Sequence, residues 1–164
     1  MQIQIGDMPA AGLTLEDRLA IEYFPALGTL TRQGECLFHS PVDVKLFITP
    51  VAGMFRVEGK LRTLVGLTCS RCLDAFSYCL ASHFHVTYTR EIPGGLGTPP
   101  EEHELKAEEM GLVPFAGEKI DFRDMLQEQV VLSIPMQPRC RNDCRGLCSQ
   151  CGTNLNLETC NCDT

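Results

Sequence analysis

The sequence of 164 residues lacks several features that define large classes of protein. No apolar run approaches the roughly 20 residues that a membrane helix needs, so we expect no membrane partner. The first twenty residues contain neither a basic segment nor an apolar one of the signal-peptide type, which predicts a cytoplasmic protein. The motifs GxSxG, HExxH and GxxxxGK[ST] are also absent, and this argues against an enzyme or a small-molecule substrate.

Positive charge is scarce as well. The chain has 21 acidic residues and 14 Lys and Arg, a net charge of −7. The acids concentrate between residues 91 and 128, a segment with ten acidic residues and only three Lys and Arg. Phosphate affinity depends on clustered cations, so the chain is a poor general binder of nucleic acid. Any contact with RNA is expected to be local.

Apolar and polar residues alternate with a period of two over much of residues 34–90, which predicts strands with one buried face. The strands are expected at about 42–48, 55–65 and 84–88. Short helices are predicted at 14–20, after an N-cap at Thr14, and at 122–132, after Asp121. Pro25 and Gly28 are expected to break the chain. The predicted fold is α+β, an antiparallel sheet or small partly closed barrel with few helices.

Two further segments frame the domain organisation. Residues 93–119, rich in Gly, Pro and Glu, predict a long acidic loop or insert, with a strand near Leu105. Pro135 and Pro138 end the second helical stretch. We therefore expect a core domain over 1–135 and a cysteine tail over 136–164 that packs on the core.

The ten cysteines indicate metal or redox chemistry, because disulfides seldom persist in a reducing compartment. A Cys-x-x-Cys-Gly turn and a Cys-x-Cys segment in the tail can together form a closed tetrahedral site for structural zinc. The predicted ligands of this first site are Cys148, Cys151, Cys160 and Cys162.

The remaining cysteines leave alternatives open. A possible second zinc site consists of Cys69, Cys72, Cys140 and Cys144. In a rival arrangement, Cys140 or Cys144 joins the later cysteines and the 69–72 pair stays free. That pair also raises the hypothesis of thiol redox chemistry, although its setting lacks the usual βαβ unit. Cys36 and Cys79 have no partner at metal spacing and are expected to be buried as small apolar residues.

Three segments resemble the YceD family of large ribosomal RNA subunit accumulation proteins. They read LTCSRCLDAF, IDFRDMLQEQVVLSIPMQPRC and GLCSQCGTNLNLETCNC, and they occur in the family's order. The resemblance implies a non-enzymatic accessory factor in large-subunit biogenesis and 23S rRNA accumulation, which binds rRNA or a ribosomal or assembly protein. A thiol redox protein and a zinc storage or delivery protein remain the alternatives.

Candidate RNA contacts surround the cysteines, since arginine is suited to bidentate phosphate binding. They are Arg71, Arg139, Arg141 and Arg145. In the competing interpretation these arginines are solvated or pair with the acidic insert. The insert itself suggests a second hypothesis, in which its carboxylates bind a basic ribosomal protein.

Overall fold

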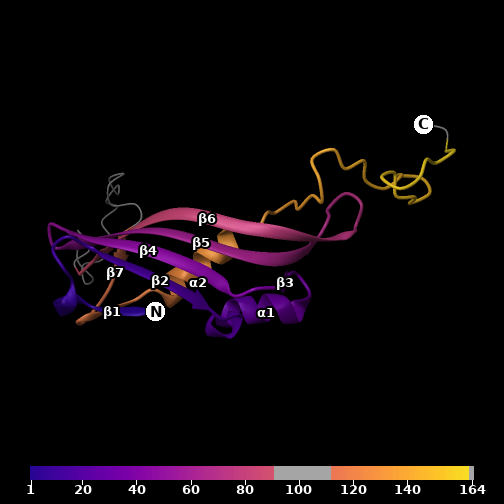
Figure 1. The fold of residues 1–164 in the computed structure, drawn as a ribbon. Helices are drawn as coiled ribbons and strands as arrows, with labels where there is room; N and C mark the ends of the chain where they lie inside the picture. The colour runs from indigo at the N-terminus through magenta and orange to yellow at the C-terminus, as the bar shows by residue number, and fades with distance from the viewer. Residues whose placement is uncertain (91–111, 163–164) are drawn as a thin grey trace, which may run out of the picture.

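The computed structural model describes residues 1–90 and 112–162, and it divides them into strands and short helices (Figure 1). The strands are β1 (Gln2–Gln4), β2 (Leu13–Leu19), β3 (Leu37–Phe38), β4 (Val42–Val51), β5 (Met54–Thr68), β6 (Ala75–Thr89), β7 (Leu112–Pro114) and β8 (Lys119–Asp121). The helices are α1 (Pro25–Gln33) and α2 (Arg123–Leu132), with 3₁₀ turns η1 (Ile5–Asp7) and η2 (Ile21–Tyr23).

The main sheet has the order β2-β4-β5-β6-β7, and β3 adds to one end of β5. Its pairs are antiparallel except β6 with β7, which is parallel. A second sheet pairs β1 with β8. The α+β prediction is confirmed. Of its two alternatives, the open sheet is observed and the barrel is not. The three predicted strands are confirmed as β4, β5 and β6, and each is longer than predicted.

One face of the main sheet is buried beneath α1 and α2 (Figure 1). Along β4 and β5 buried and exposed residues alternate almost strictly, as the period of two predicts. The largest fully buried side chains are Phe24, Leu27, Val42, Leu46, Ile48, Val57, Val65, Leu80, Ile120, Phe122, Leu126 and Val130. The opposite face is not covered by either helix, and its side chains are mostly exposed.

The helix predicted at 14–20 is wrong. These residues form β2, which pairs antiparallel with β4, Leu15 lying opposite Leu46. Leu13, Leu15 and Leu19 recur at even spacing and face the core, whereas Thr14 and Glu16 point outward. Tertiary pairing with β4 therefore overrides the local helix-start signal of Thr14.

The chain break predicted at Pro25 and Gly28 is also wrong, because both residues lie in α1. Proline is compatible with the first turn of a helix, where its missing N–H has no partner to lose. The helix ends at Gly34, whose φ of 75° provides a left-handed C-cap.

The second predicted helix is confirmed as α2, with a small shift at its start. Phe122 is the N-cap residue, and the carboxylate of Asp121 accepts a hydrogen bond of 2.9 Å from the N–H of Arg123. The apolar stripe of this helix is buried, from Phe122 through Met125 and Leu126 to Val130.

The predicted insert extends too far toward the C-terminus. Its last residues, 112–119, include strand β7 and the start of β8. The rest of the acidic stretch and the strand predicted near Leu105 lie outside the described residues. Within the described ranges, no helix has the length and apolarity to cross a lipid bilayer.

Candidate metal centres

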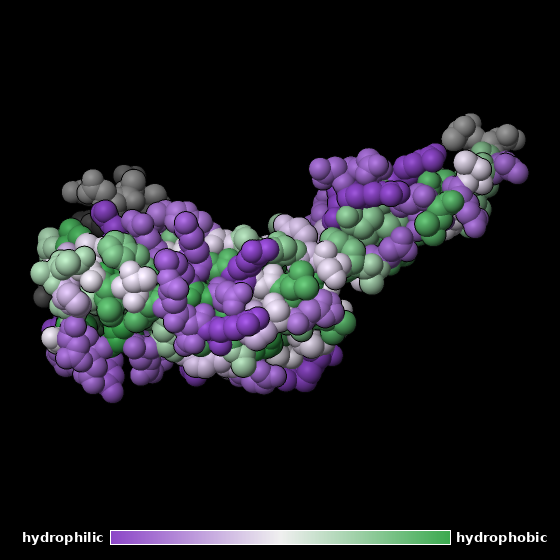
Figure 2. All heavy atoms as spheres, viewed as in Figure 1, coloured by the Kyte–Doolittle hydropathy of each residue, from purple (hydrophilic) through white to green (hydrophobic). Residues whose placement is uncertain are grey.

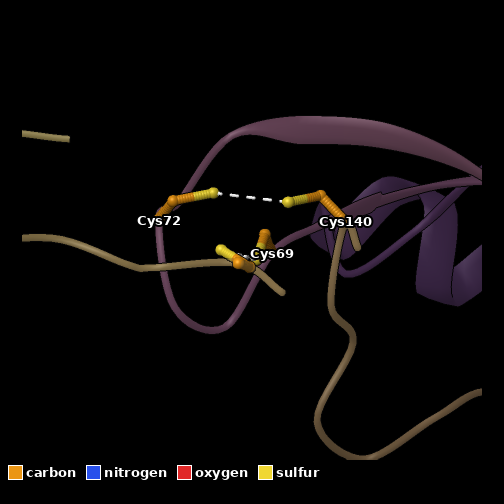
Figure 3. A group of neighbouring side chains, drawn as sticks. Cys69, Cys72 and Cys140 are labelled. Atoms are coloured by element: carbon orange, nitrogen blue, oxygen red, sulfur yellow. Dashed lines mark hydrogen bonds between the residues drawn. The ribbon is translucent and has the colours of Figure 1, made fainter. Parts of the chain in front are cut away.

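Four cysteines meet where the connection between β5 and β6 touches the tail. Figure 3 labels three of them, Cys69, Cys72 and Cys140. We call this group the hairpin cluster: Cys69, Cys72, Cys140 and Cys144. Its sulfur atoms all lie within 4.8 Å of one another. Cys69, Cys72 and Cys144 are buried, with 0%, 3% and 1% of their surface exposed. The structure thus brings together the four residues predicted for a second site, rather than the rival set.

The other four tail cysteines form a second group, the tail cluster: Cys148, Cys151, Cys160 and Cys162. Their sulfur atoms also lie within 4.8 Å of one another, and Cys151 is exposed. These are the residues predicted for the first site. The two groups use eight of the ten cysteines, and none of the ten forms a disulfide.

The two Cys-x-x-Cys segments adopt the same turn. In the hairpin cluster, the N–H of Leu73 donates to the carbonyl of Cys69 at 3.0 Å, and the N–H of Cys69 donates to Asp74 at 2.9 Å. In the tail cluster, Gly152 donates to Cys148 at 2.9 Å, and Cys148 donates to Thr153 at 2.8 Å. Each turn aims two sulfur atoms toward one point.

The residue after the second cysteine of each turn has left-handed backbone, with φ of 61° at Leu73 and 74° at Gly152. Glycine adopts this conformation freely, whereas a leucine pays about 1 kcal/mol or more for it. Leu73 is also 65% exposed, so the strained conformation gains little from burial of its side chain. The strain is instead consistent with a constraint from the four converging sulfur atoms.

Hydrogen bonds attach the tail to the hairpin between β5 and β6. The N–H of Ser70 donates to the carbonyl of Pro138 at 2.8 Å, and Leu147 donates to that of Arg71 at 3.1 Å. A Cβ on Gly146 would lie 3.1 Å from the carbonyl oxygen of Arg71, so a glycine permits this close approach. The tail continues outward from that point (Figure 1).

Two asparagines between the tail-cluster cysteines connect the clusters, although no sequence motif marks them. The amide of Asn156 donates to the sulfur of Cys144 at 3.4 Å, and its oxygen accepts from the N–H of Arg145 at 2.8 Å. Asn154 donates to the carboxylate of Asp74 at 2.8 Å. Hydrogen bonds of this kind orient ligands and stabilise thiolate charge.

The sulfur spacing fits a tetrahedral metal ion. With Zn–S bonds of about 2.3 Å, the sulfurs of a tetrahedral site are about 3.8 Å apart. The sulfur–sulfur distances in the structure are 3.8 Å for Cys69 and Cys144, 3.7 Å for Cys72 and Cys140, and 3.5 Å for Cys148 and Cys160. A disulfide requires about 2.05 Å. Both clusters therefore match an all-thiolate metal site better than a disulfide pair.

The pKa values of the cysteines in the hairpin cluster also favour a metal site. Hydrogen bonds from the backbone of Cys140 and then Cys72 lower the pKa of Cys69 to about 6. A hydrogen bond from the backbone of Asp74 acts to lower the pKa of Cys72, but burial and the neighbouring thiols raise it to about 12. One thiol ionises readily while its neighbour retains a proton, because adjacent thiolates repel each other.

The tail cluster likewise contains one cysteine with a lowered pKa and one with a raised pKa. Hydrogen bonds from the backbone of Cys151 and Gln150 lower the pKa of Cys148 to about 6. The hydrogen bond with Cys151, together with burial, raises the pKa of Cys162 to about 12. A divalent cation would remove the conflict in both clusters, since every thiolate would then face positive charge.

The four predicted arginines are exposed around the hairpin cluster. Arg71 lies in the 69–72 turn, whereas Arg139, Arg141 and Arg145 flank Cys140 and Cys144. Arg141 donates to Asn156 at 2.8 Å and lies 3.6 Å from Asp143. Within the described ranges, the side chains of the other three form no salt bridge.

The two remaining cysteines differ from each other. Cys36 is buried, as predicted, with 3% of its surface exposed. The same prediction is wrong for Cys79, which is exposed on β6 and accepts a hydrogen bond of 3.1 Å from Nε of Arg62. It lies on the outward face because Leu80, next to it, takes the buried position.

Comparison with known proteins identifies the family to which this chain belongs. The model of the family described as "Large ribosomal RNA subunit accumulation protein YceD" matches residues 57–164, which include both cysteine clusters. The chain belongs to the YceD family. The matched region begins within β5 and so contains the hairpin, α2 and the tail.

Curated relatives of this YceD protein come from plants and bacteria. "Large ribosomal RNA subunit accumulation protein YCED homolog 1, chloroplastic" of Zea mays is 27% identical in an alignment of 143 residues, which covers 75% of this chain and 49% of that protein. The protein of the same name from Arabidopsis thaliana is 26% identical in an alignment of 141 residues, which covers 75% of this chain and 44% of that protein. A Mycobacterium tuberculosis protein is 43% identical over 117 residues, or 71% and 53%. The chain thus spans about half the length of these relatives. No solved structure matches it.

Proposed function

We propose that this YceD protein is a non-enzymatic accessory factor in large ribosomal subunit biogenesis, and that it supports 23S rRNA accumulation by binding rRNA. In this proposal each cysteine cluster holds one structural zinc ion, and the bound tail presents arginines to the RNA. The observation that carries the proposal is the pair of complete Cys₄ sets, with four exposed arginines around the hairpin cluster. The family's printed description supports the ribosomal role.

The donor set favours zinc in a structural role. Four thiolates complete a tetrahedron and leave no open position for water or substrate, so neither site is suited to catalysis. A proposed cytoplasmic location keeps the thiols reduced and available to metal. We also propose that residues 136–164 form a distinct metal-bound unit attached to the core over 1–135.

The arginines favour RNA as the partner. The guanidinium groups of Arg71, Arg139 and Arg145 form no salt bridge in the described part of the chain and are open to phosphate. A zinc ion with four thiolates carries a net charge of −2, so these arginines also lower the electrostatic cost of the hairpin cluster. Measuring metal content alongside RNA binding separates the two roles.

The burial of the hairpin cluster disfavours the two alternatives. A redox cysteine needs access to its substrate, yet Cys69 has no exposed surface and Cys72 only 3%. A storage or delivery protein needs exchangeable metal, whereas an ion at this cluster would also join the tail to the hairpin. Slow exchange of the metal and protection of these thiols from a mild alkylating reagent are therefore expected.

The test is crosslinking of the tagged full chain in cells, followed by sequencing of the bound RNA. We expect enrichment of large-subunit rRNA, and an approximately tenfold reduction for the variant Arg71→Gln/Arg139→Gln/Arg145→Gln because three phosphate contacts are lost. The variant should keep its zinc. A matched control, Arg32→Gln/Lys119→Gln/Arg123→Gln, removes the same charge from α1, β8 and α2 and should crosslink like the wild type. Recovery of no ribosomal RNA by the wild type would contradict the RNA-binding role.

A further inference from the structure

The face of the main sheet opposite α1 and α2 carries a charge pattern that the metal clusters do not explain. Its outward side chains on β2, β4 and β5 include five cations and three carboxylates, a net charge of +2 in a chain of −7. The cations are Arg18, Lys45, Arg56, Lys60 and Arg62, and the carboxylates are Glu16, Asp43 and Glu58. Hydrophilic residues gather over β4 and β5 in the middle of the sheet (Figure 2).

Two of the three carboxylates form salt bridges with cations of β2 and β4, whereas on β5 Arg62 donates a hydrogen bond to Cys79. Arg18 pairs with Asp43 at 3.2 Å, and Lys45 pairs with Glu16. The three cations of β5 form no salt bridge within residues 1–90 and 112–162. Excess positive charge therefore lies along one central strand.

The register places Lys60 unfavourably for the fold alone, whereas Arg62 lies opposite the carboxylate of Asp43. Lys60 lies directly opposite Lys45 on β4 and opposite His83 on β6. Like charges at directly opposed positions destabilise a sheet, because their side chains come within about 5 Å. Lys45, Lys60 and Arg62 also border a shallow hollow of about 400 Å³, whose lining includes the carboxylates of Glu16, Asp17 and Asp43 as well. An anion above this row would offset the repulsion.

Exposed rings lie beside the cations. Phe47 on β4 is 42% exposed and lies opposite Glu58, and its ring is adjacent to Gly12, which has no side chain to cover it. His83 and His85 are exposed on β6, with ring centroids 4.8 Å apart. Stacking on rings together with contacts to cations is how open sheets bind unpaired bases and their phosphates.

From these observations we propose that the uncovered sheet face is a binding surface for single-stranded RNA. Arg56, Lys60 and Arg62 contact phosphates, while Phe47 and the His83–His85 pair stack on bases. The inference rests on the proposed function, and it adds a second surface to the arginines at the hairpin cluster. The exposed rings favour single-stranded RNA over a duplex. A duplex offers phosphates to the cations, but its bases remain stacked on one another and cannot stack on the rings.

The test measures affinity of the full, zinc-loaded chain for a mixed-sequence single-stranded RNA of 20 nucleotides and for the same sequence as a duplex. The wild type should prefer the single strand. The variant Arg56→Gln/Lys60→Gln/Arg62→Gln should bind it at least tenfold more weakly, and the slope of log affinity against log salt should fall by about two. Phe47→Leu, which keeps apolar bulk, should weaken binding roughly fivefold or more without changing that slope.

The matched control is Arg32→Gln/Lys119→Gln/Arg123→Gln, which should bind within twofold of the wild type. If both sheet-face variants bind like the wild type while the hairpin-arginine variant loses affinity, the sheet face is not an RNA surface and the proposed function stands. A preference for the duplex also overturns the inference. Binding of neither RNA by the wild type overturns the RNA-binding role itself.

Discussion

Cys69→Ser is expected to release the tail from the hairpin while the sheet stays folded. The substitution removes one ligand from the hairpin cluster, and structural zinc contributes on the order of 10 kcal/mol to ordering the segments that it joins. Residues 136–147 should then lose most of their amide protection in hydrogen exchange, whereas β4 and β5 should keep theirs. The zinc content of the chain should fall by one ion.

Cys79→Ser is the matched control, because Cys79 is an exposed thiol outside both clusters. It should leave the metal content and the exchange pattern unchanged. The experiment also decides between the ligand arrangements, since in the rival set Cys69 and Cys72 hold no metal. An unchanged zinc content in the Cys69 variant would contradict the proposed hairpin site.

Phe122→Ala is expected to lower the free energy of unfolding of the core by about 3–5 kcal/mol. Phe122 is fully buried at the start of α2, and its ring packs edge-on against Tyr88 of β6 at 5.6 Å between centroids. Removing the ring leaves a cavity between the helix and the sheet. Because domains of this size are stable by only about 5–15 kcal/mol, urea denaturation will show the loss as a large shift of the midpoint.

Leu132→Ala, at the other end of α2, is the control for Phe122→Ala. It truncates a large side chain in the same helix at a position that does not pack on the sheet. Leu132 is 76% exposed, so its truncation should change the free energy of unfolding by no more than about 0.5 kcal/mol. A loss below about 1 kcal/mol for Phe122→Ala would mean that α2 does not pack on the sheet as described.

Parts of the fold that depend on one segment's own pattern could be predicted from the sequence. The alternation in β4, β5 and β6 persists over many residues, and the apolar stripe of α2 is clear. β2 was predicted wrongly because Thr14 followed by acids imitates a helix start, and only pairing with β4 decides the outcome. The pairing of β1 with β8 joins residues more than 110 positions apart, which no local pattern indicates.

The candidate site also has parts that the sequence could predict and parts that it could not. Spacing alone groups Cys148 with Cys151 and Cys160 with Cys162, because short loops restrict where their sulfurs can point. The meeting of Cys69 with Cys144 depends on how the tail folds back, so the sequence left it among alternatives. Asn156 gave no signal, since an asparagine in a turn is ordinary and only the structure shows its amide beside Cys144.

The most direct test of two structural metal sites is elemental analysis of the natively purified full chain, combined with hydrogen exchange of its tail. We predict two zinc ions per chain, and loss of amide protection over residues 138–162 when a strong chelator removes them. A chain that holds no metal while these residues remain protected would contradict it.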